Sequence, residues 1–101
     1  MLIYNVTIKI DRNIQKEWMR WMRAVHIPKM QREGNFVGHR ICKLLGTDER
    51  DGFTYAVQYL CPDVGVYRQF QLKKEAQLDQ TMLQRFPNQL VHFASVLEIL
   101  E

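Results

Sequence analysis

Residues 36–60 read FVGHRICKLLGTDERDGFTYAVQYL and contain two strand patterns on either side of a charged turn. The runs 36–45 and 53–60 are rich in β-branched, aromatic and other apolar residues. Between them, GTDERDG at 46–52 begins and ends with glycine and holds four charged residues. A polar, glycine-bounded stretch between two such runs is typical of a hairpin loop, so residues 36–60 are predicted to form a β-hairpin.

Alternation in the second strand of this hairpin predicts which side faces a core. The apolar side carries Phe53, Tyr55, Val57 and Tyr59. The other side carries Thr54, Ala56 and Gln58. Because side chains alternate between the two faces of a strand, the four large residues are predicted to be buried.

The N-terminal run 2–10 shows the same alternation and predicts another strand. Its apolar side is made of Tyr4, Val6, Ile8 and Ile10. Its more polar side includes Asn5 and Thr7. A last strand is predicted over 90–100, after the Pro-Asn pair at 87–88.

A helix is predicted between the first strand and the hairpin. Its apolar residues recur at helical spacing as Ile14, Trp18, Trp21, Met22 and Val25. Asp11 is expected to cap its start with a side-chain hydrogen bond. Pro28 disfavours helical geometry in the preceding residue, so the helix is expected to end or kink near His26. A short continuation through Arg32 is expected to stop at 34–35, Gly-Asn.

A second helix is predicted between the hairpin and the last strand, with Asp63 as its cap and 87–88 as its end. Its apolar residues change face midway. Val66, Tyr67 and Phe70 share one side, whereas the nearly opposite side carries Leu72, Ala76, Leu83 and Phe86. A kink within 73–76 would account for this change.

The order strand–helix–strand–strand–helix–strand predicts an α+β, ferredoxin-like fold over residues 1–101 as one domain, a four-stranded antiparallel sheet with both helices on one face. The other sheet face is predicted to carry the polar side chains of Asn5, Thr7, Arg40, Thr54, Gln58, His92 and Glu98. Apolar residues are expected among them: Ile3, Ala56, Leu60, Ala94 and Val96. A mixed face suits a homodimer, a dimeric α+β barrel in which two sheets stack around a semi-polar cavity.

Composition predicts an ordinary globular protein, with 47% hydrophobic and 25% charged residues and a net charge of +3. The basic row Arg12, Lys16, Arg20 and Arg23 is interpreted as a solvated helix face rather than a nucleic-acid site. No apolar run is long enough to span a membrane, and the residues at the N-terminal end are not expected to act as a secretion signal. Cys42 and Cys61 have no metal-binding spacing and are expected to be reduced thiols, which favours a cytoplasmic location.

Several segments resemble a bacterial family known as a domain of unknown function, number 4286. They are YNVT at 4–7, EWMRWM at 17–22, HIP at 26–28, GHRI at 38–41 and TYAVQY at 54–59. The resemblance covers nearly the whole chain and implies the fold, but no activity. More distantly, Trp21, His26 and Pro28 resemble the helix of dimeric α+β barrel proteins of the EthD and antibiotic-biosynthesis-monooxygenase kind. That resemblance implies homodimers with cavities for hydrophobic organic molecules or haem.

His26 is the candidate catalytic residue, as acid, base or ligand anchor. It lies beside the apolar stripe at an expected helix end, where carbonyl dipoles favour the imidazolium form. A histidine that only hydrogen-bonds the last carbonyls of the helix is the structural alternative.

Asn5, Thr7, Arg40 and Gln58 are the candidate ligand-binding residues of the open sheet face. Their alternatives are an ordinary wet face or a polar dimer interface. His39 and Arg40 must point to opposite faces, and the neighbouring pattern favours Arg40. No metal site and no cofactor are predicted, since the three histidines lie apart and the Trp18 stripe is typical of a core.

Two hypotheses from different classes follow. The first is a dimer that binds a small, partly apolar organic ligand between the sheet and the first helix, with acid–base or oxidative chemistry at His26. The second is a structural or regulatory homodimer without a ligand. An RNA-binding module is a remote alternative, because Phe53 and Tyr55 resemble its base-stacking aromatics but are predicted to face the helices.

Overall fold

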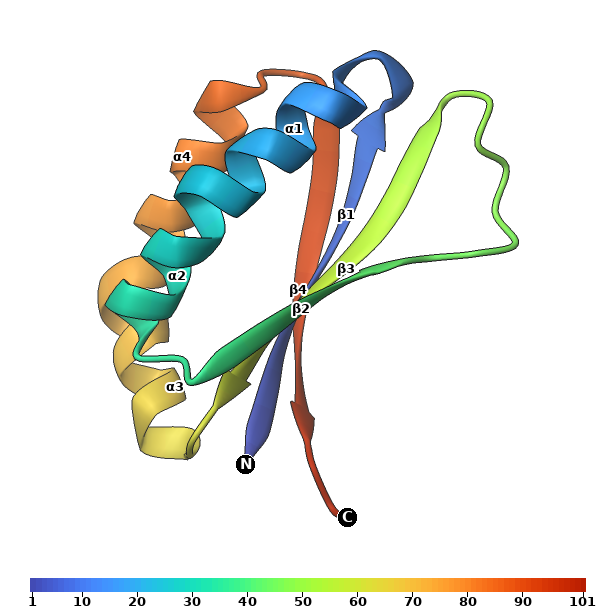
Figure 1. The fold of residues 1–101 in the computed structure, drawn as a ribbon. Helices are drawn as coiled ribbons and strands as arrows, with labels where there is room; N and C mark the ends of the chain where they lie inside the picture. Colours follow the sequence, from blue (N-terminus) through green and yellow to red (C-terminus); the bar gives the residue numbers. More distant parts are fainter.

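The computed structural model describes residues 1–101 and shows one four-stranded antiparallel sheet covered on one face by helices (Figure 1). The strands are β1 (Leu2–Asp11), β2 (Gly38–Lys43), β3 (Gly52–Cys61) and β4 (Leu90–Glu98). Their order across the sheet is β2-β3-β1-β4. The predicted α+β, ferredoxin-like fold is thereby confirmed.

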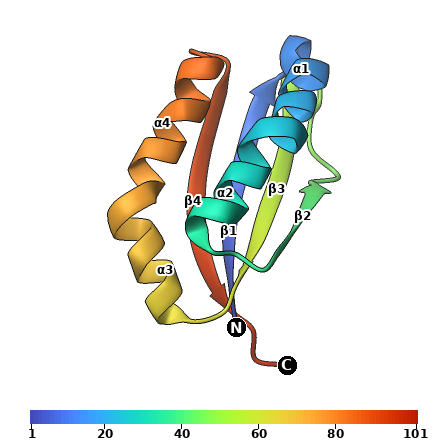
Figure 2. The same ribbon diagram turned by 60° about the vertical axis from the view of Figure 1, so that its left-hand side comes forward.

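Each helical segment of the prediction is a continuous helix with one π-helical turn. The first contains the 3₁₀ turn η1 (Arg12–Ile14), α1 (Gln15–Trp21), the π turn η2 (Met22–His26) and α2 (Ile27–Gly34). The second contains α3 (Val64–Phe70), the π turn η3 (Gln71–Glu75) and α4 (Ala76–Arg85). Both helical segments run along the same side of the sheet, which leaves the other side uncovered (Figure 2).

The π turn η2 moves the buried side of the first helix by one residue. Trp18 and Met22 are buried as the apolar stripe predicts, but Val25 is 48% exposed, so its predicted place in the stripe is wrong. A π turn holds one more residue than an α turn, and the inward position after Met22 therefore falls on His26. The stripe continues from there to Met30, which is buried.

The π turn η3 has the same effect on the second helix. Leu72, Ala76 and Leu83 are all exposed, so of the four residues predicted to share the second apolar face only Phe86 is buried. After Phe70, the side chains that face the core are instead Leu78, Met82 and Phe86. The predicted change of face is therefore real, but its cause is an inserted residue rather than a bend.

Helix capping differs between the two helices. The Asp63 carboxylate accepts a hydrogen bond from the backbone N–H of Val66 at 2.9 Å, as predicted. Asp11 makes no such bond, and its predicted capping role is wrong. The strand β1 continues through Asp11, whose N–H donates to the carbonyl of Gln89 at 2.8 Å. At the other end of the first helix, Asn35 adopts the expected left-handed conformation with φ of 55°.

The two aspartates provide a direct test of capping. Asp63→Ala should lower the free energy of unfolding by about 1 kcal/mol, because it leaves a helix N–H without its acceptor. Asp11→Ala is the matched control and should change it by less than about 0.5 kcal/mol. Urea unfolding measures both, and equal losses would contradict the assignment of the cap to Asp63.

The core lies between the helices and the sheet. The predicted inward side of β1, Tyr4, Val6, Ile8 and Ile10, is buried throughout. So is the predicted inward side of β3, Phe53, Tyr55, Val57 and Tyr59. Strand β2 is shorter than the predicted run 36–45, because residues 44–51 form an irregular connection to β3. None of the helices has the length and apolar character that crossing a membrane requires.

Candidate functional site

The strand register brings four polar residues into one row on the uncovered face of the sheet. On β1, Asn5 pairs with Gln58 of β3 and with Ser95 of β4. Gln58 pairs in turn with Arg40 of β2. Directly paired residues of antiparallel strands point to the same face. Arg40, Gln58, Asn5 and Ser95 therefore cross all four strands as a single line, called the polar row below.

Hydrogen bonds connect the polar row and fix its direction. The Arg40 Nε donates to the Gln58 Oε1 at 2.6 Å, and the Gln58 Nε2 donates to the Asn5 Oδ1 at 3.1 Å. The Asn5 Nδ2 then lies 3.4 Å from the Ser95 Oγ and 3.3 Å from the Thr7 Oγ1. A guanidinium only donates, so each amide must present its oxygen toward Arg40 and its nitrogen away from it.

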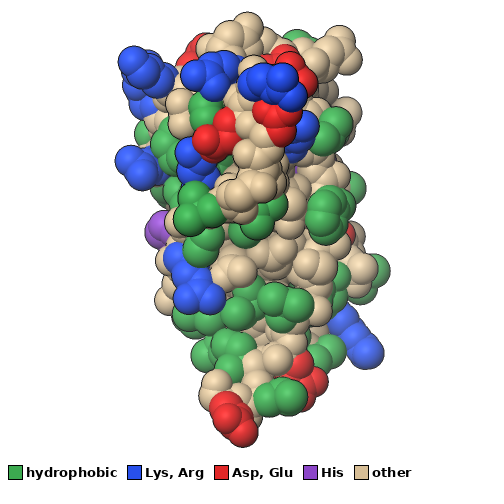
Figure 3. Space-filling model, turned by 90° about the vertical axis from the view of Figure 1, so that its right-hand side faces the viewer, with side chains coloured by type: hydrophobic (Ala, Val, Ile, Leu, Met, Phe, Trp, Pro, Cys, Tyr) green, Lys and Arg blue, Asp and Glu red, His purple; other side chains and the backbone are tan.

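Apolar side chains flank the polar row on the same face. The neighbouring row on one side is Gly38, Leu60, Ile3 and Leu97. The row on the other side is Cys42, Ala56, Thr7 and Phe93. Phe93 is 64% exposed, and Val91 and Leu97 are also exposed. Figure 3 shows hydrophobic side chains spread over the middle and lower parts of the side away from the helices, with most charged groups at the upper end.

A hollow of about 180 Å³ lies at the Arg40 end of the polar row. Arg40 and Gln58 form its polar wall, and Ile3, Leu60 and Ile99 form an apolar one. In the row next to the polar row, Gly38 pairs with Leu60 and presents no side chain toward the open face. The hollow therefore combines a cation with an apolar surface.

The structure places four of the five candidate site residues together and separates the fifth. Arg40, Gln58, Asn5 and Thr7 share the uncovered face, and the preference for Arg40 over His39 agrees with the strand register. His26 lies on the opposite side of the sheet, beneath the helices, and is 5% exposed. A single cavity that contains all five residues is therefore wrong, because the sheet separates them.

His26 sits in a dry and aromatic environment. Its ring stacks on Trp21 with centroids 5.0 Å apart, and its Nδ1 is buried without a hydrogen-bond partner. Burial lowers the pKa of His26 to about 4, and the positive charges of Lys29 and His92 act in the same direction. The expectation that a helix end favours the imidazolium is wrong, because the helix continues through η2 into α2. His26 is a neutral imidazole at pH 7.

Strand β4 faces the opposite way to the prediction. His92 pairs with Ile8, Ala94 with Val6, Val96 with Tyr4 and Glu98 with Leu2, so all four lie on the helix side. Sequence reasoning missed the residues that do lie on the open face, Val91, Phe93, Ser95 and Leu97. Both sides of this strand are partly apolar, so alternation alone does not orient it. The available signal was Leu90, which is buried opposite Ile10 and sets the side for every second residue after it.

A second polar cluster lies beneath the helices, on the opposite side of the sheet from the polar row. The Tyr4 hydroxyl donates to the Glu75 Oε2 at 2.5 Å, and burial raises the pKa of Tyr4. Burial also raises the pKa of Asp79; the charge of Glu75 adds to this rise and His92 opposes it. These groups hold polar contacts within the core. No set of three His, Cys, Asp or Glu side chains is arranged to hold a metal ion.

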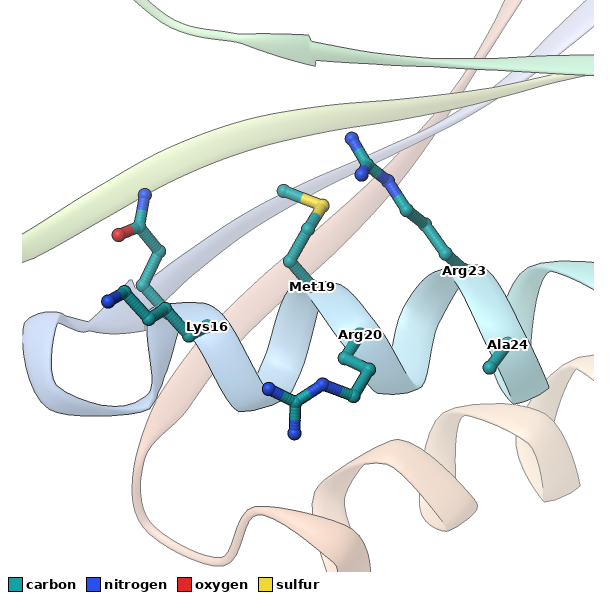
Figure 4. A pocket seen from close by; sticks show the side chains of 6 residues that line it. Lys16, Met19, Arg20, Arg23 and Ala24 are labelled. Carbon is teal, nitrogen blue, oxygen red and sulfur yellow. The ribbon is translucent and has the colours of Figure 1, made fainter.

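The basic row of the first helix borders a shallow hollow of about 660 Å³. Figure 4 shows Lys16, Arg20 and Arg23 along the helix, with Met19 among them and Ala24 beyond Arg23. All of its lining residues come from residues 15–24, and no second element closes it. This geometry agrees with a solvated helix face.

The aromatic side of β3 is unavailable for stacking on bases. Phe53 and Tyr55 are buried beneath the helices, and Trp18 stacks on Tyr55 with centroids 5.1 Å apart. The RNA-binding alternative therefore lacks its aromatic platform on this strand. Trp18 is itself fully buried, as expected of a core residue.

Fold and open face together define a ferredoxin-like α+β protein with one uncovered sheet surface. The sequence matches the family described as Domain of unknown function (DUF4286) over residues 1–100, and the chain belongs to that family. No curated protein matches it. The family description assigns no activity. The similar solved structures share little sequence identity with this chain, so they bear on the fold alone.

Three solved structures illustrate this similarity. An EthD family protein from Bacillus halodurans is 12% identical, with a TM-score of 0.65 over 99% of this chain and 100% of that chain. A putative antibiotic biosynthesis monooxygenase from Deinococcus radiodurans is 11% identical, with a TM-score of 0.68 over 100% and 94%. A dimeric ferredoxin-like protein from an uncultured marine organism is 8% identical, with a TM-score of 0.68 over 100% and 96%. The predicted resemblance to EthD and monooxygenase proteins is confirmed at the level of fold.

Proposed function

We propose that the chain forms a homodimer in which two open sheet faces stack and enclose a cavity for a small, partly apolar organic molecule. The observation that carries this proposal is the open face itself. It exposes Val91, Phe93 and Leu97 on β4, beside a polar row whose amides already bond one another. Contiguous exposed apolar surface rimmed by polar groups is characteristic of an interaction site.

A second copy of the chain is the occupant that best fits this face. The face spans all four strands, and a two-fold axis would bring the same apolar rows of both protomers together. One of the similar structures is described as a dimeric ferredoxin-like protein, which supports a homodimer here. Burial of exposed aromatic and aliphatic side chains would supply the driving force.

The polar row gives the cavity its specificity. Arg40, Gln58, Asn5 and Thr7 would be the ligand contacts, with apolar walls from Ile3 and the rows beside them. A mostly apolar cavity with a few oriented polar groups is typical of small-molecule sites. His26 takes no part in this site, because a proton transfer would require it within hydrogen-bond reach of the ligand.

A neutral fluorescent probe tests the proposed cavity. N-phenyl-1-naphthylamine should bind the wild-type dimer with enhanced emission, and sedimentation equilibrium should give the dimer mass. Ala56→Phe, which adds volume on the open face, should weaken probe binding at least about tenfold. Ala76→Phe on the exposed surface of α4 is the matched control and should bind like the wild type.

The outcomes separate the two classes of function. A dimer that binds no neutral probe would favour a structural or regulatory dimer, since the bonds within the polar row then serve only the interface. A monomer at all concentrations would contradict the proposal.

A further inference from the structure

Arg40 carries a charge that nothing in the chain neutralises. The four ion pairs of the structure join Lys43 to Glu49, Arg50 to Asp48, Lys74 to Glu33 and Arg85 to Glu17. The only side-chain hydrogen bond of Arg40 goes to the neutral amide of Gln58, through Nε. Both terminal amino groups of the guanidinium are therefore free to donate.

No carboxylate of the chain lies within ion-pair distance of Arg40. The polar row and the two rows beside it contain no carboxylate. The acidic residue on this side of a strand is Asp11, at the far end of β1. It lies six residues beyond Asn5 along the strand, a distance of about 20 Å.

Stacking of two sheets would take this charge out of water. A buried ion without a partner is strongly unfavourable, and a two-fold dimer would bury the same residue from both protomers. The hydrogen bonds of the polar row add to this, because the Gln58 oxygen already accepts from Arg40 Nε and the Asn5 oxygen already accepts from Gln58, so neither is a free acceptor for the terminal amino groups. An anion must therefore enter with the ligand.

We infer that the ligand of the proposed cavity is a carboxylate with an apolar body, bound through the two terminal amino groups of Arg40. This inference rests on the proposed function. Gln58 holds Nε and so orients the planar guanidinium, which leaves a fork that matches the two oxygens of a carboxylate. The apolar body would lie in the adjoining hollow of about 180 Å³, against Ile3, Leu60 and Ile99.

Isothermal titration with 2-naphthoate and its neutral isostere 2-naphthamide tests the inference. Wild-type protein should bind the carboxylate at least about tenfold more tightly than the amide, as expected of a charge-assisted, two-point contact. Arg40→Met should remove this preference, because it weakens binding of the carboxylate far more than binding of the amide. Arg68→Met, a charge removed from the exposed surface of α3, should retain it.

The alternatives give different results. Equal binding of naphthoate and naphthamide to the wild type would overturn the inference while the proposed cavity stands. No binding of either compound, together with no binding of the neutral fluorescent probe, would remove the cavity itself. If Asp11→Asn weakens the dimer as much as Arg40→Met and naphthoate has no effect on dimer affinity, the partner's carboxylate neutralises Arg40 and the inference is wrong.

Discussion

The Phe93→Asp substitution is expected to separate the proposed dimer into monomers while each protomer stays folded. Phe93 lies on the open face of β4 and is largely exposed in the single chain, so it adds little to the core. In a stacked dimer it would be buried, and a carboxylate there would lose its hydration and replace a large apolar contact. The dissociation constant of the dimer should rise at least about a hundredfold.

Sedimentation equilibrium measures this change, and urea unfolding checks the fold. Leu72→Asp is the matched control, because Leu72 is 79% exposed on the helical side and receives the same charge. The control should remain a dimer. If both variants remain dimers, or both dissociate, the interface is not the open sheet face.

The second large effect is a loss of stability on acidification that originates at His26. Its pKa is lowered from 6.5 to about 4 in the folded protein, chiefly by burial. Between pH 6.5 and pH 4, His26 is protonated in the unfolded chain but stays neutral in the folded one. The free energy of unfolding therefore falls as the pH drops from 6.5 toward 4. Between pH 7 and pH 5 this contribution is about 2 kcal/mol.

Urea unfolding at both pH values tests the contribution of His26. His26→Gln is expected to remove most of this pH-dependent loss, whatever it costs in packing against Trp21. His39 is an exposed side chain of β2, and His39→Gln should keep the difference in unfolding free energy that the wild type shows between the two pH values. If the wild type and His26→Gln show the same change in unfolding free energy between pH 7 and pH 5, the buried neutral state of His26 is contradicted.

The elements that sequence predicts best are those with one strongly apolar side. In β1 and β3 the alternation of large apolar residues with Asn5, Thr7 and Gln58 leaves one choice of inward face, and the structure agrees. Those faces put Asn5 and Gln58 on the same surface, but their direct pairing is known only from the register in the structure. The candidate ligand residues of the open face could therefore be placed on one surface from sequence alone.

The position of His26 could not be predicted in this way. Helical periodicity assumes 3.6 residues in every turn, and the π turn η2 adds one residue just before it. This addition exchanges the positions of Val25 and His26, so a flanking histidine becomes a buried one. The residue pattern does not predict where the extra residue of the π turn lies, because its position depends on how both halves of the helix pack on the same sheet.

The last strand failed for a different reason. Its side beginning at Val91 is the more apolar one but faces away from the helices, so the choice of inward side depends on the register with β1 rather than on alternation. That register places Ser95 rather than His92 beside the polar row. The open face is therefore more apolar than predicted, which favours a dimer more strongly.

Hydroxyl-radical footprinting across a range of protein concentrations tests the central claim most directly, because it reports which surface a second copy covers. We expect Phe93 and Leu97 to become protected as concentration rises, while the oxidation of Leu72 stays constant. Unchanged oxidation of Phe93 and Leu97 at the highest concentration would contradict the account, since the open sheet face would then remain in water.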